Sequence, residues 1–281
     1  MSEIGTIREA PAAMERHLTP TRHGYVHSRS WGSGDAALIL LHMGPLSGRM
    51  FERIGPLLAA GRRVVAIDRI GYGASDALRR PLAFVEYAEA TVDAIDALGI
   101  GTFDVFGVHT GSSEALCLAS TLGKRIRRVA VMGLIAFGDG EREAFLNRPG
   151  TNGTPAVATD GAHLLSMWRR WTGWRVDGWS DEDLERAVEQ EIASFPRSAW
   201  TVPEVFRFPT VKVLRAIAQP LLIIMPTDYL WESTRGALES APPGTRVVEI
   251  AMSPRTAAPT GLFDTMPASL ARTIGAFLDV R

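Results

Sequence analysis

Cysteine is almost absent from this sequence of 281 residues, since Cys117 is its single example. One cysteine excludes an internal disulfide and any zinc site built on cysteine ligands. Long apolar runs are also missing, and no stretch approaches the roughly 18 apolar residues of a membrane-spanning helix. Residues 1–14 lack the apolar segment of a signal peptide. We therefore expect a cytoplasmic protein with no membrane partner.

An excess of charge of either sign is lacking too. The formal net charge is −1 at pH 7, which gives no electrostatic reason to expect a nucleic-acid partner. The hydrophobic share of 46% and the charged share of 22% are typical of a globular protein with a large core. Histidine is sparse, with six in total and none after His163. The sequence calls for neither a metal nor a cofactor, and we expect none.

Short apolar runs alternate with helical patterns along most of the chain. Runs of this kind are typical of strands buried on both faces of a sheet. The predicted strands cover residues 23–31, 36–41, 63–67, 103–106, 128–134, 220–225 and 246–250, and the predicted helices cover 48–60, 84–98, 112–122 and 269–278. This alternation predicts an α/β fold with a mainly parallel, doubly wound sheet of about eight strands. Residues 1–20 are expected to form a tail, and residues 23–35 a hairpin strand with its turn.

The alternation lapses between residues 138 and 208, where five of the seven tryptophans lie. Two of them, Trp168 and Trp171, follow helical spacing. A capping box at residues 180–183 predicts the start of a further helix. We therefore predict an α/β core domain and a helical cap insertion. The core comprises residues 1–137 and 209–281, and the cap comprises residues 138–208.

The segment from Phe103 to Leu122 has the pattern strand, tight turn, helix. Its turn begins at Gly107, ends at Gly111 and has His109 in the middle. Glycines are needed where a sharp turn brings two backbones together and leaves no space for a Cβ atom. The central residue of such a turn directs its side chain into a site, and the free N–H groups of the following helix face the same place. His109 is therefore the leading candidate for a catalytic residue.

Three other polar loops follow predicted strands. Residues 42–45 read His-Met-Gly-Pro, residues 68–76 form a glycine-rich loop between two aspartates, and Asp228 follows the strand 220–225. The carboxyl ends of parallel strands share one edge of a sheet. We expect these loops and His109 to meet at that edge.

Together these motifs resemble the α/β-hydrolase fold, in the branch with epoxide hydrolases, haloalkane dehalogenases and haloperoxidase-like esterases. The resemblance covers roughly residues 23–281 and is least distinctive in the cap. The His-Met-Gly-Pro loop is similar to the H-G-x-P oxyanion loop of that family, with Met43 where glycine is usual. The resemblance implies that the N–H groups of Gly44 and Thr110 form the oxyanion hole. It also gives Asp228 the position of the triad acid.

The catalytic residues of the family are only partly matched. His109 occupies the position of the Ser, Asp or Cys nucleophile. The distal histidine of the family lies before the last helix, and Thr260 occupies that position here. Because no histidine follows His163, a Ser-His-Asp triad cannot be assembled from this chain. The resemblance therefore implies the fold together with an atypical site.

A histidine at the turn needs no second histidine. A serine hydroxyl is a weak nucleophile until a neighbouring base takes its proton. A neutral imidazole already offers a lone pair at about pH 7. His109 could act as a nucleophile or as a general base, and its second ring nitrogen needs an acceptor that sets the tautomer. Asp139 and Asp228 are both candidates for that acceptor, and the residues alone do not choose between them. The resemblance favours Asp228, which holds the family's usual acid position.

Three functions are consistent with these residues. The first is a hydrolase that acts on a small apolar ester or carbonyl substrate. The second is a lyase, isomerase or cyclase that uses His109 as a base, and the third is a catalytically inactive ligand-binding protein on the same fold. The side chains predicted to contact a small-molecule substrate are Met43, Trp168, Trp171 and Trp231. The oligomeric state cannot be read from the sequence.

Overall fold

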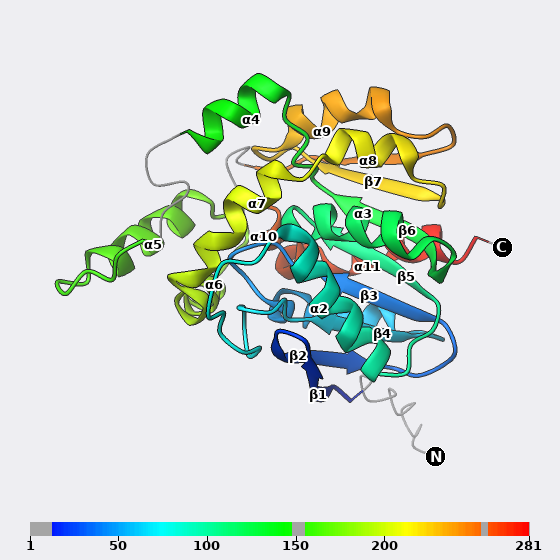
Figure 1. Ribbon diagram of the computed structural model, residues 1–281, viewed down its shortest axis with the longest axis horizontal. Coiled ribbons are helices and arrows are strands. Elements are labelled where there is room, and N and C mark those ends of the chain that lie inside the picture. The colour runs from blue at the N-terminus through cyan, green and yellow to red at the C-terminus, as the bar shows by residue number, and fades with distance from the viewer. Residues whose placement is uncertain (1–12, 148–154, 254–257, 281) are drawn as a thin grey trace, which may run out of the picture.

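The computed structural model describes residues 13–147, 155–253 and 258–280. Within these residues, eight strands form one sheet in the order β1-β2-β4-β3-β5-β6-β7-β8, with helices against both faces (Figure 1). Pairing is antiparallel from β1 to β2 and from β2 to β4, and parallel between all other neighbours. The strands are β1 (Glu15–Thr21), β2 (Gly24–Trp31), β3 (Ala37–Leu41), β4 (Arg63–Ile67), β5 (Phe103–Val108), β6 (Ile126–Met132), β7 (Leu221–Pro226) and β8 (Arg246–Ile250). The predicted mainly parallel eight-stranded sheet is confirmed.

Helices fill each connection between consecutive strands from β3 onward. The α-helices are α1 (Gly55–Leu58), α2 (Phe84–Ala97), α3 (Thr110–Leu122), α4 (Asp139–Leu146), α5 (Ala162–Gly173), α6 (Asp181–Ser194), α7 (Thr201–Arg207), α8 (Thr210–Ala216), α9 (Trp231–Ala237), α10 (Thr260–Thr265) and α11 (Pro267–Leu278). Short 3₁₀ turns are η1 (Gly48–Phe51), η2 (Gly123–Arg125), η3 (Arg197–Trp200) and η4 (Leu238–Ser240). In the part of the chain that the structure describes, no helix has both the length and the apolar character needed to span a membrane.

The central strands are buried on both faces, which explains their continuous apolar runs. Along β3, Leu38 and Leu40 join the cluster that packs against α1 and α11. Ile39 and Leu41 join the cluster on the other face, against α2 and α3. Each fully buried side chain of this size stabilises the fold by roughly 1.5–3 kcal/mol relative to exposure. The two layers of helices therefore hold the sheet rigid beneath its loops.

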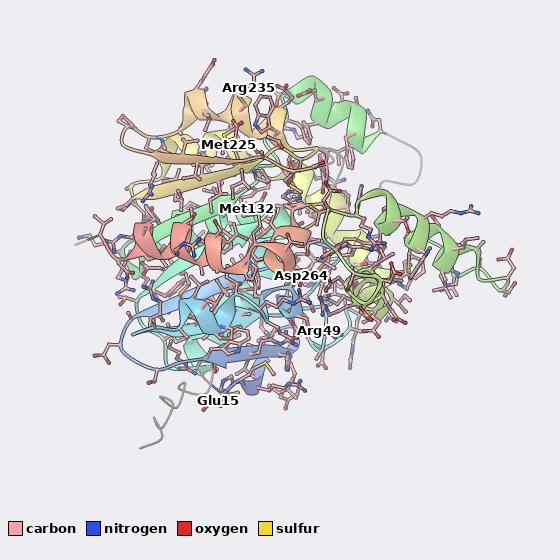
Figure 2. All side chains as sticks on the ribbon, turned by 180° about the vertical axis from the view of Figure 1, so that it is seen from behind. Glu15, Arg49, Met132, Met225, Arg235 and Asp264 are labelled. Atoms are coloured by element: carbon pink, nitrogen blue, oxygen red, sulfur yellow. The ribbon has the colours of Figure 1, made fainter. Side chains whose placement is uncertain are left out.

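We call residues 138–208 the helical insertion. It leaves the sheet after β6, returns through α8 to β7, and places α4 to α7 at one end of the sheet (Figure 1). The predicted capping box is present, since Ser180 Oγ accepts the N–H of Asp183 at 3.1 Å. Trp179 of the insertion donates its indole N–H to Asp264 Oδ2 of α10 at 2.7 Å. Asp264 lies where the insertion meets the rest of the chain (Figure 2).

Two predictions at the N-terminal side of the sheet are wrong. Residues 15–20 belong to strand β1 and not to a tail, while residues 1–12 lie outside the described residues. The sequence pattern did not indicate a strand here, because β1 is an edge strand that exposes Leu18. It also contains Pro20, which edge strands tolerate. The turn at residues 32–35 does not close a hairpin, because β4 lies between β2 and β3.

A buried carboxylate, Asp68, ties β2 to the loops after β3 and β4. It accepts hydrogen bonds from His27 Nδ1 at 2.8 Å, from Arg29 Nη1 at 2.7 Å, and from the N–H groups of Gly48 and Ala74 at 2.7 and 3.0 Å. Burial alone would raise the pKa of Asp68, but His27 and Arg29 outweigh burial and lower that pKa to about 2. The carboxylate therefore stays charged and keeps both loops in place beside the sheet edge.

Replacing Asp68 by asparagine is expected to lower the free energy of unfolding by about 3–5 kcal/mol at pH 7, because Arg29 would keep its buried charge without this partner. The control is Asp96→Asn, whose carboxylate is half exposed and pairs with Arg125. That change should cost less than about 1 kcal/mol. Denaturant unfolding measures both losses, and equal losses would contradict the structural role of Asp68.

The contribution of Asp68 should also depend on pH. Its folded pKa of about 2 lies below the unfolded value of about 3.9, so the stabilisation is complete above about pH 4 and is lost as the pH falls to about 2.

Candidate active site

His109 is the single residue between a strand and a helix. Strand β5 ends at Val108, α3 begins at Thr110, and His109 has φ 50° and ψ −108°. Among the described residues it is the only one other than glycine with a positive φ. A Cβ atom on Gly107 would lie 2.0 Å from the carbonyl oxygen of Gly111, and one on Gly111 would lie 2.1 Å from that of Leu41. Both ends of the turn therefore require glycine.

The imidazole of His109 is buried and bonded at both nitrogens. Nε2 lies 2.8 Å from Asp228 Oδ2, and Nδ1 lies 3.0 Å from the hydroxyl oxygen of Tyr229. The other oxygen of Asp228 accepts the N–H of Leu230 at 2.8 Å. An ionised carboxylate can only accept hydrogen bonds. We therefore assign the ring hydrogen of the neutral imidazole to Nε2, so that the lone pair of Nδ1 accepts the O–H of Tyr229.

Gly133 makes the contact between His109 and Asp228 possible. Strand β6 lies between β5 and β7, so the imidazole must cross the end of β6 to reach Asp228. A Cβ atom on Gly133, which has φ 67°, would lie 2.5 Å from Cδ2 and 2.7 Å from Nε2 of His109. Sequence reasoning missed this residue and included it in the strand 128–134. The available signal was a glycine at the end of the strand that follows the turn.

The two implied oxyanion donors lie close to His109. Gly44 and Thr110 line the same cavity as His109, and the N–H of Gly44 donates to Thr110 Oγ1 at 3.1 Å. His42 braces this loop, since its Nδ1 donates to the carbonyl oxygen of Met43 at 2.9 Å and its Nε2 accepts the N–H of Arg69 at 3.0 Å. Burial and the Arg69 guanidinium lower the pKa of His42 to about 3, so its ring is neutral.

A cavity of about 1010 Å³ opens beside these groups, between the carboxyl-end loops of the sheet and the helical insertion. His109 and Tyr229 line it on the sheet side. Most of the residues that the insertion contributes are apolar, and the larger ones are Phe145, Met167, Trp174, Phe195 and Phe206. The insertion also contributes His163, Arg170 and Glu191, of which Arg170 and Glu191 form an ion pair with each other.

The four side chains predicted to contact a substrate do not line this cavity. Trp171 and Met43 are buried in the core, Trp168 is 41% exposed to solvent, and Trp231 packs against the core cluster that includes α3. Trp174, directly after α5, lines the cavity instead. Helical spacing identified the correct helix but could not tell which face of that helix turns toward the sheet edge.

Asp139 does not contact His109. It lies in the first turn of α4, where its exposed carboxylate pairs with Arg142. Of the two candidate acceptors, the structure places Asp228 beside the imidazole. Within the described ranges, no group of three or more His, Cys, Asp or Glu side chains is arranged to hold a metal ion.

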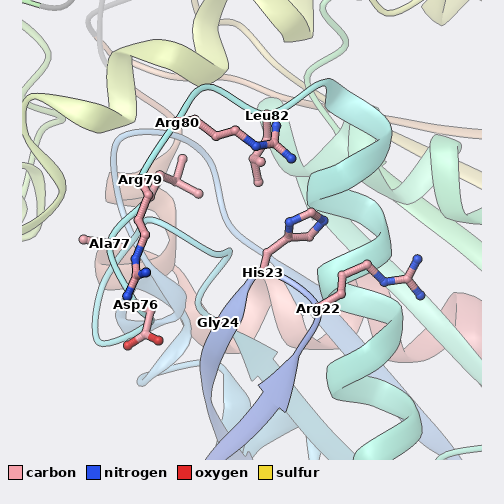
Figure 3. A pocket seen from close by; sticks show the side chains of 9 residues that line it. Arg22, His23, Gly24, Asp76, Ala77, Arg79, Arg80 and Leu82 are labelled. Atoms are coloured by element: carbon pink, nitrogen blue, oxygen red, sulfur yellow. The ribbon is translucent and has the colours of Figure 1, made fainter.

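A second hollow of about 650 Å³ lies beside the turn between β1 and β2 (Figure 3). Its basic side chains are Arg22, His23, Arg79 and Arg80. Arg22 and Arg80 already pair with carboxylates of α2. The hollow shares no lining residue with the cavity at His109, and we assign it no role in the chemistry.

Comparison with known proteins decides the family. Residues 36–204, more than half of the chain, match the family model described as the alpha/beta hydrolase fold. The chain belongs to the alpha/beta hydrolase fold family. A 2-hydroxy-6-oxo-6-phenylhexa-2,4-dienoate hydrolase from Burkholderia cepacia is 34% identical over 115 residues, which cover 38% of this chain and 39% of the relative. A 2-hydroxy-6-oxononadienedioate/2-hydroxy-6-oxononatrienedioate hydrolase from Burkholderia vietnamiensis is 31% identical over 140 residues, which cover 46% and 47% of the two chains. The chain thus spans less than half the length of either relative.

Solved structures of alpha/beta hydrolases agree with the observed fold. An enol-lactonase from Burkholderia xenovorans superposes with a TM-score of 0.75 at 18% identity, covering 94% of this chain and 100% of that one. A bromoperoxidase from Bacillus anthracis superposes with a TM-score of 0.74 at 21% identity, covering 95% and 100%. At such identities the likeness shows the fold alone, because function depends on the site.

The serines after the turn are expected to resist a fluorophosphonate probe of the kind that labels serine hydrolases. Ser112 and Ser113 are fully buried, and Ser112 Oγ lies 2.9 Å from the carbonyl oxygen of Gly107 and 3.0 Å from that of Met132. Mass spectrometry of the treated protein should find neither serine modified. Stoichiometric labelling of either one would make this chain a serine hydrolase after all.

Gly133→Ala should destabilise this member of the alpha/beta hydrolase fold family more than Gly123→Ala does. Both glycines have a positive φ, which costs a residue with a side chain roughly 1–2 kcal/mol. A Cβ atom at Gly123 meets nothing within 4 Å, whereas one at Gly133 overlaps the ring of His109. Overpacking adds typically 1–3 kcal/mol. Denaturant unfolding of the two variants measures the difference, and equal stabilities would show that the ring of His109 moves aside freely.

Proposed function

We propose that this protein is an enzyme of hydrolase type that acts on a small, apolar ester or other carbonyl substrate, with His109 as a general base in place of a serine nucleophile. The observation that carries the proposal is the bond between His109 Nε2 and Asp228 Oδ2, 2.8 Å long and buried at the edge of the cavity. A carboxylate in this position sets the tautomer of the imidazole and stabilises the imidazolium that forms when the ring takes a proton.

The cavity supports a small, largely apolar substrate. Its volume of about 1010 Å³ matches the upper part of the range for small-molecule sites, roughly 300–1,000 Å³. The Arg170 guanidinium is paired with Glu191 and lies over the ring of Trp174, so its charge is already balanced without an anionic substrate. The two relatives are named as hydrolases of oxo-dienoates and oxo-dienedioates or trienedioates, and the enol-lactonase is named for a cyclic ester. Each of those names supports carbonyl chemistry, and none identifies the substrate of this chain.

The contacts of His109 favour the role of base over that of nucleophile. A nucleophilic nitrogen must present its lone pair directly to the substrate carbon. The lone pair of Nδ1 already accepts a hydroxyl, while Nε2 faces Asp228. A base can instead take a proton from water as the water attacks a carbonyl carbon. The N–H groups of Thr110 and Gly44 are the proposed donors to the resulting oxyanion, which would replace Thr110 Oγ1 as the acceptor of the Gly44 N–H.

Replacing His109 by alanine is expected to lower kcat by roughly 10²- to 10⁴-fold, the usual effect of losing a positioned acid–base group. Asp228→Asn should also lower kcat, because the amide cannot stabilise the imidazolium in the same way. The measurement uses p-nitrophenyl acetate and p-nitrophenyl butyrate, with His23→Ala, a histidine remote from the cavity, as the matched control. Product analysis should find one molecule of water added for each ester cleaved.

Two results would contradict parts of the proposed function. Full activity in the His109→Ala variant would remove the catalytic role of this histidine. A substrate that binds in the cavity and is rearranged or split without the addition of water would favour a lyase or isomerase that uses the same base.

A further inference from the structure

Within this proposed function, we infer that Tyr229 is a second catalytic residue, whose hydroxyl group stands between His109 and the substrate and passes protons between them. Asp228 binds one side of the imidazole and Tyr229 the other, and His109 and Tyr229 both line the cavity. About half of Tyr229 (49%) is exposed, against 2% of His109. The Tyr229 hydroxyl occupies Nδ1 of His109, so a proton that moves between this nitrogen and a substrate in the cavity has a path through the phenol.

The ring of Tyr229 is held from two sides. It meets the imidazole of His109 edge-on, with ring centroids 5.2 Å apart and an angle of 86° between the planes. Its other neighbour is Trp174 of the helical insertion, which stacks on it with centroids 5.9 Å apart and an angle of 19°. This packing directs the hydroxyl to Nδ1 of His109 at 3.0 Å, where a proton can be exchanged.

The three groups follow the order of a catalytic triad: carboxylate, imidazole, hydroxyl. A base oriented by a carboxylate and bonded to a hydroxyl is the arrangement that activates an otherwise weak O–H group. Burial of the phenol group, together with the charge of Asp228, raises the pKa of Tyr229. The phenol is therefore protonated at neutral pH, and it needs a base such as His109 before it can accept a proton from anything else.

The proton path for ester cleavage balances without any further reactant. The oxygen of water attacks the carbonyl carbon, and the O–H bond of that water breaks as its proton moves to the oxygen of Tyr229. The phenolic proton moves at the same time to Nδ1 of His109, and the π electrons of the carbonyl become the lone pair of the oxyanion. When the oxyanion collapses, the leaving alkoxide takes a proton from Tyr229, which regains one from His109. The products are one acid and one alcohol.

Tyr229→Phe is the decisive variant because it keeps the ring that packs on Trp174 and removes only the hydroxyl. We expect kcat on p-nitrophenyl butyrate to fall roughly 10²-fold or more, with a smaller change in KM. The double variant His109→Ala/Tyr229→Phe should be no slower than His109→Ala alone, because residues that act as one unit are not additive. Tyr25→Phe is the matched control, since that tyrosine is equally exposed at 49% and lies on β2.

Three other outcomes would each contradict a defined part of the inference. If Tyr229→Phe is as active as the wild type while His109→Ala is inactive, the relay is wrong and the proposed function stands. If His109→Ala is fully active, both are wrong. If rapid quenching and peptide mapping find an acyl group on Tyr229, the phenol is a nucleophile and not a relay. Thermal unfolding of each variant confirms that any loss of activity occurs in folded protein.

Discussion

The hydrogen bond from His109 to Asp228 is the interaction on which the site depends. It runs from the end of β5 to the end of β7, and the imidazole passes over the end of β6, where Gly133 leaves room. It also needs the positive φ of His109, a conformation that costs a non-glycine residue of order 1–3 kcal/mol. The turn is held by hydrogen bonds of 2.8 Å from the N–H of His109 to the carbonyl of Met132 and from the N–H of Ser112 to the carbonyl of His109. Strain that the surrounding structure maintains is a feature of functional sites.

A buried ion pair helps to position the loop that carries Gly44 at the cavity. Arg69 and Glu114 are both almost fully buried, with Arg69 Nε 2.7 Å from Glu114 Oε2, and Thr91 donates to the other carboxylate oxygen at 2.6 Å. The backbone N–H of Arg69 fixes the ring of His42, which in turn fixes the loop that carries Gly44. Such a pair gains little stability over apolar packing of similar volume. We therefore regard it as a device that positions the loop.

The fold could be predicted from the sequence because its determinants are local. The apolar runs of β3 to β7, the paired glycines around His109 and the loops after the strands each follow from a few adjacent residues. The site could be predicted only in part, because its geometry depends on which segments become neighbours. The residues alone do not choose between Asp228 and Asp139, and Asp228 is favoured only by its position in the resemblance; the structure adds that β7 lies next to β6. Finding Trp174 required knowing which face of α5 turns inward. Tyr229 gave no pattern in the sequence, since its proposed role depends on the distance to a ring 120 residues earlier in the chain.

In the proposed mechanism, one imidazole at the turn removes the need for a distal histidine. In the usual triad the histidine links a carboxylate to a hydroxyl that lies at the turn. Here the imidazole itself occupies the turn and reaches the carboxylate directly, so Thr260 at the distal position is buried at the start of α10 without harm to the link. In the proposed relay the hydroxyl comes from Tyr229, which follows Asp228 directly in the chain. A single loop between β7 and α9 thus supplies the partners of both imidazole nitrogens, and Trp174 connects the position of that phenol to the helical insertion that encloses the cavity.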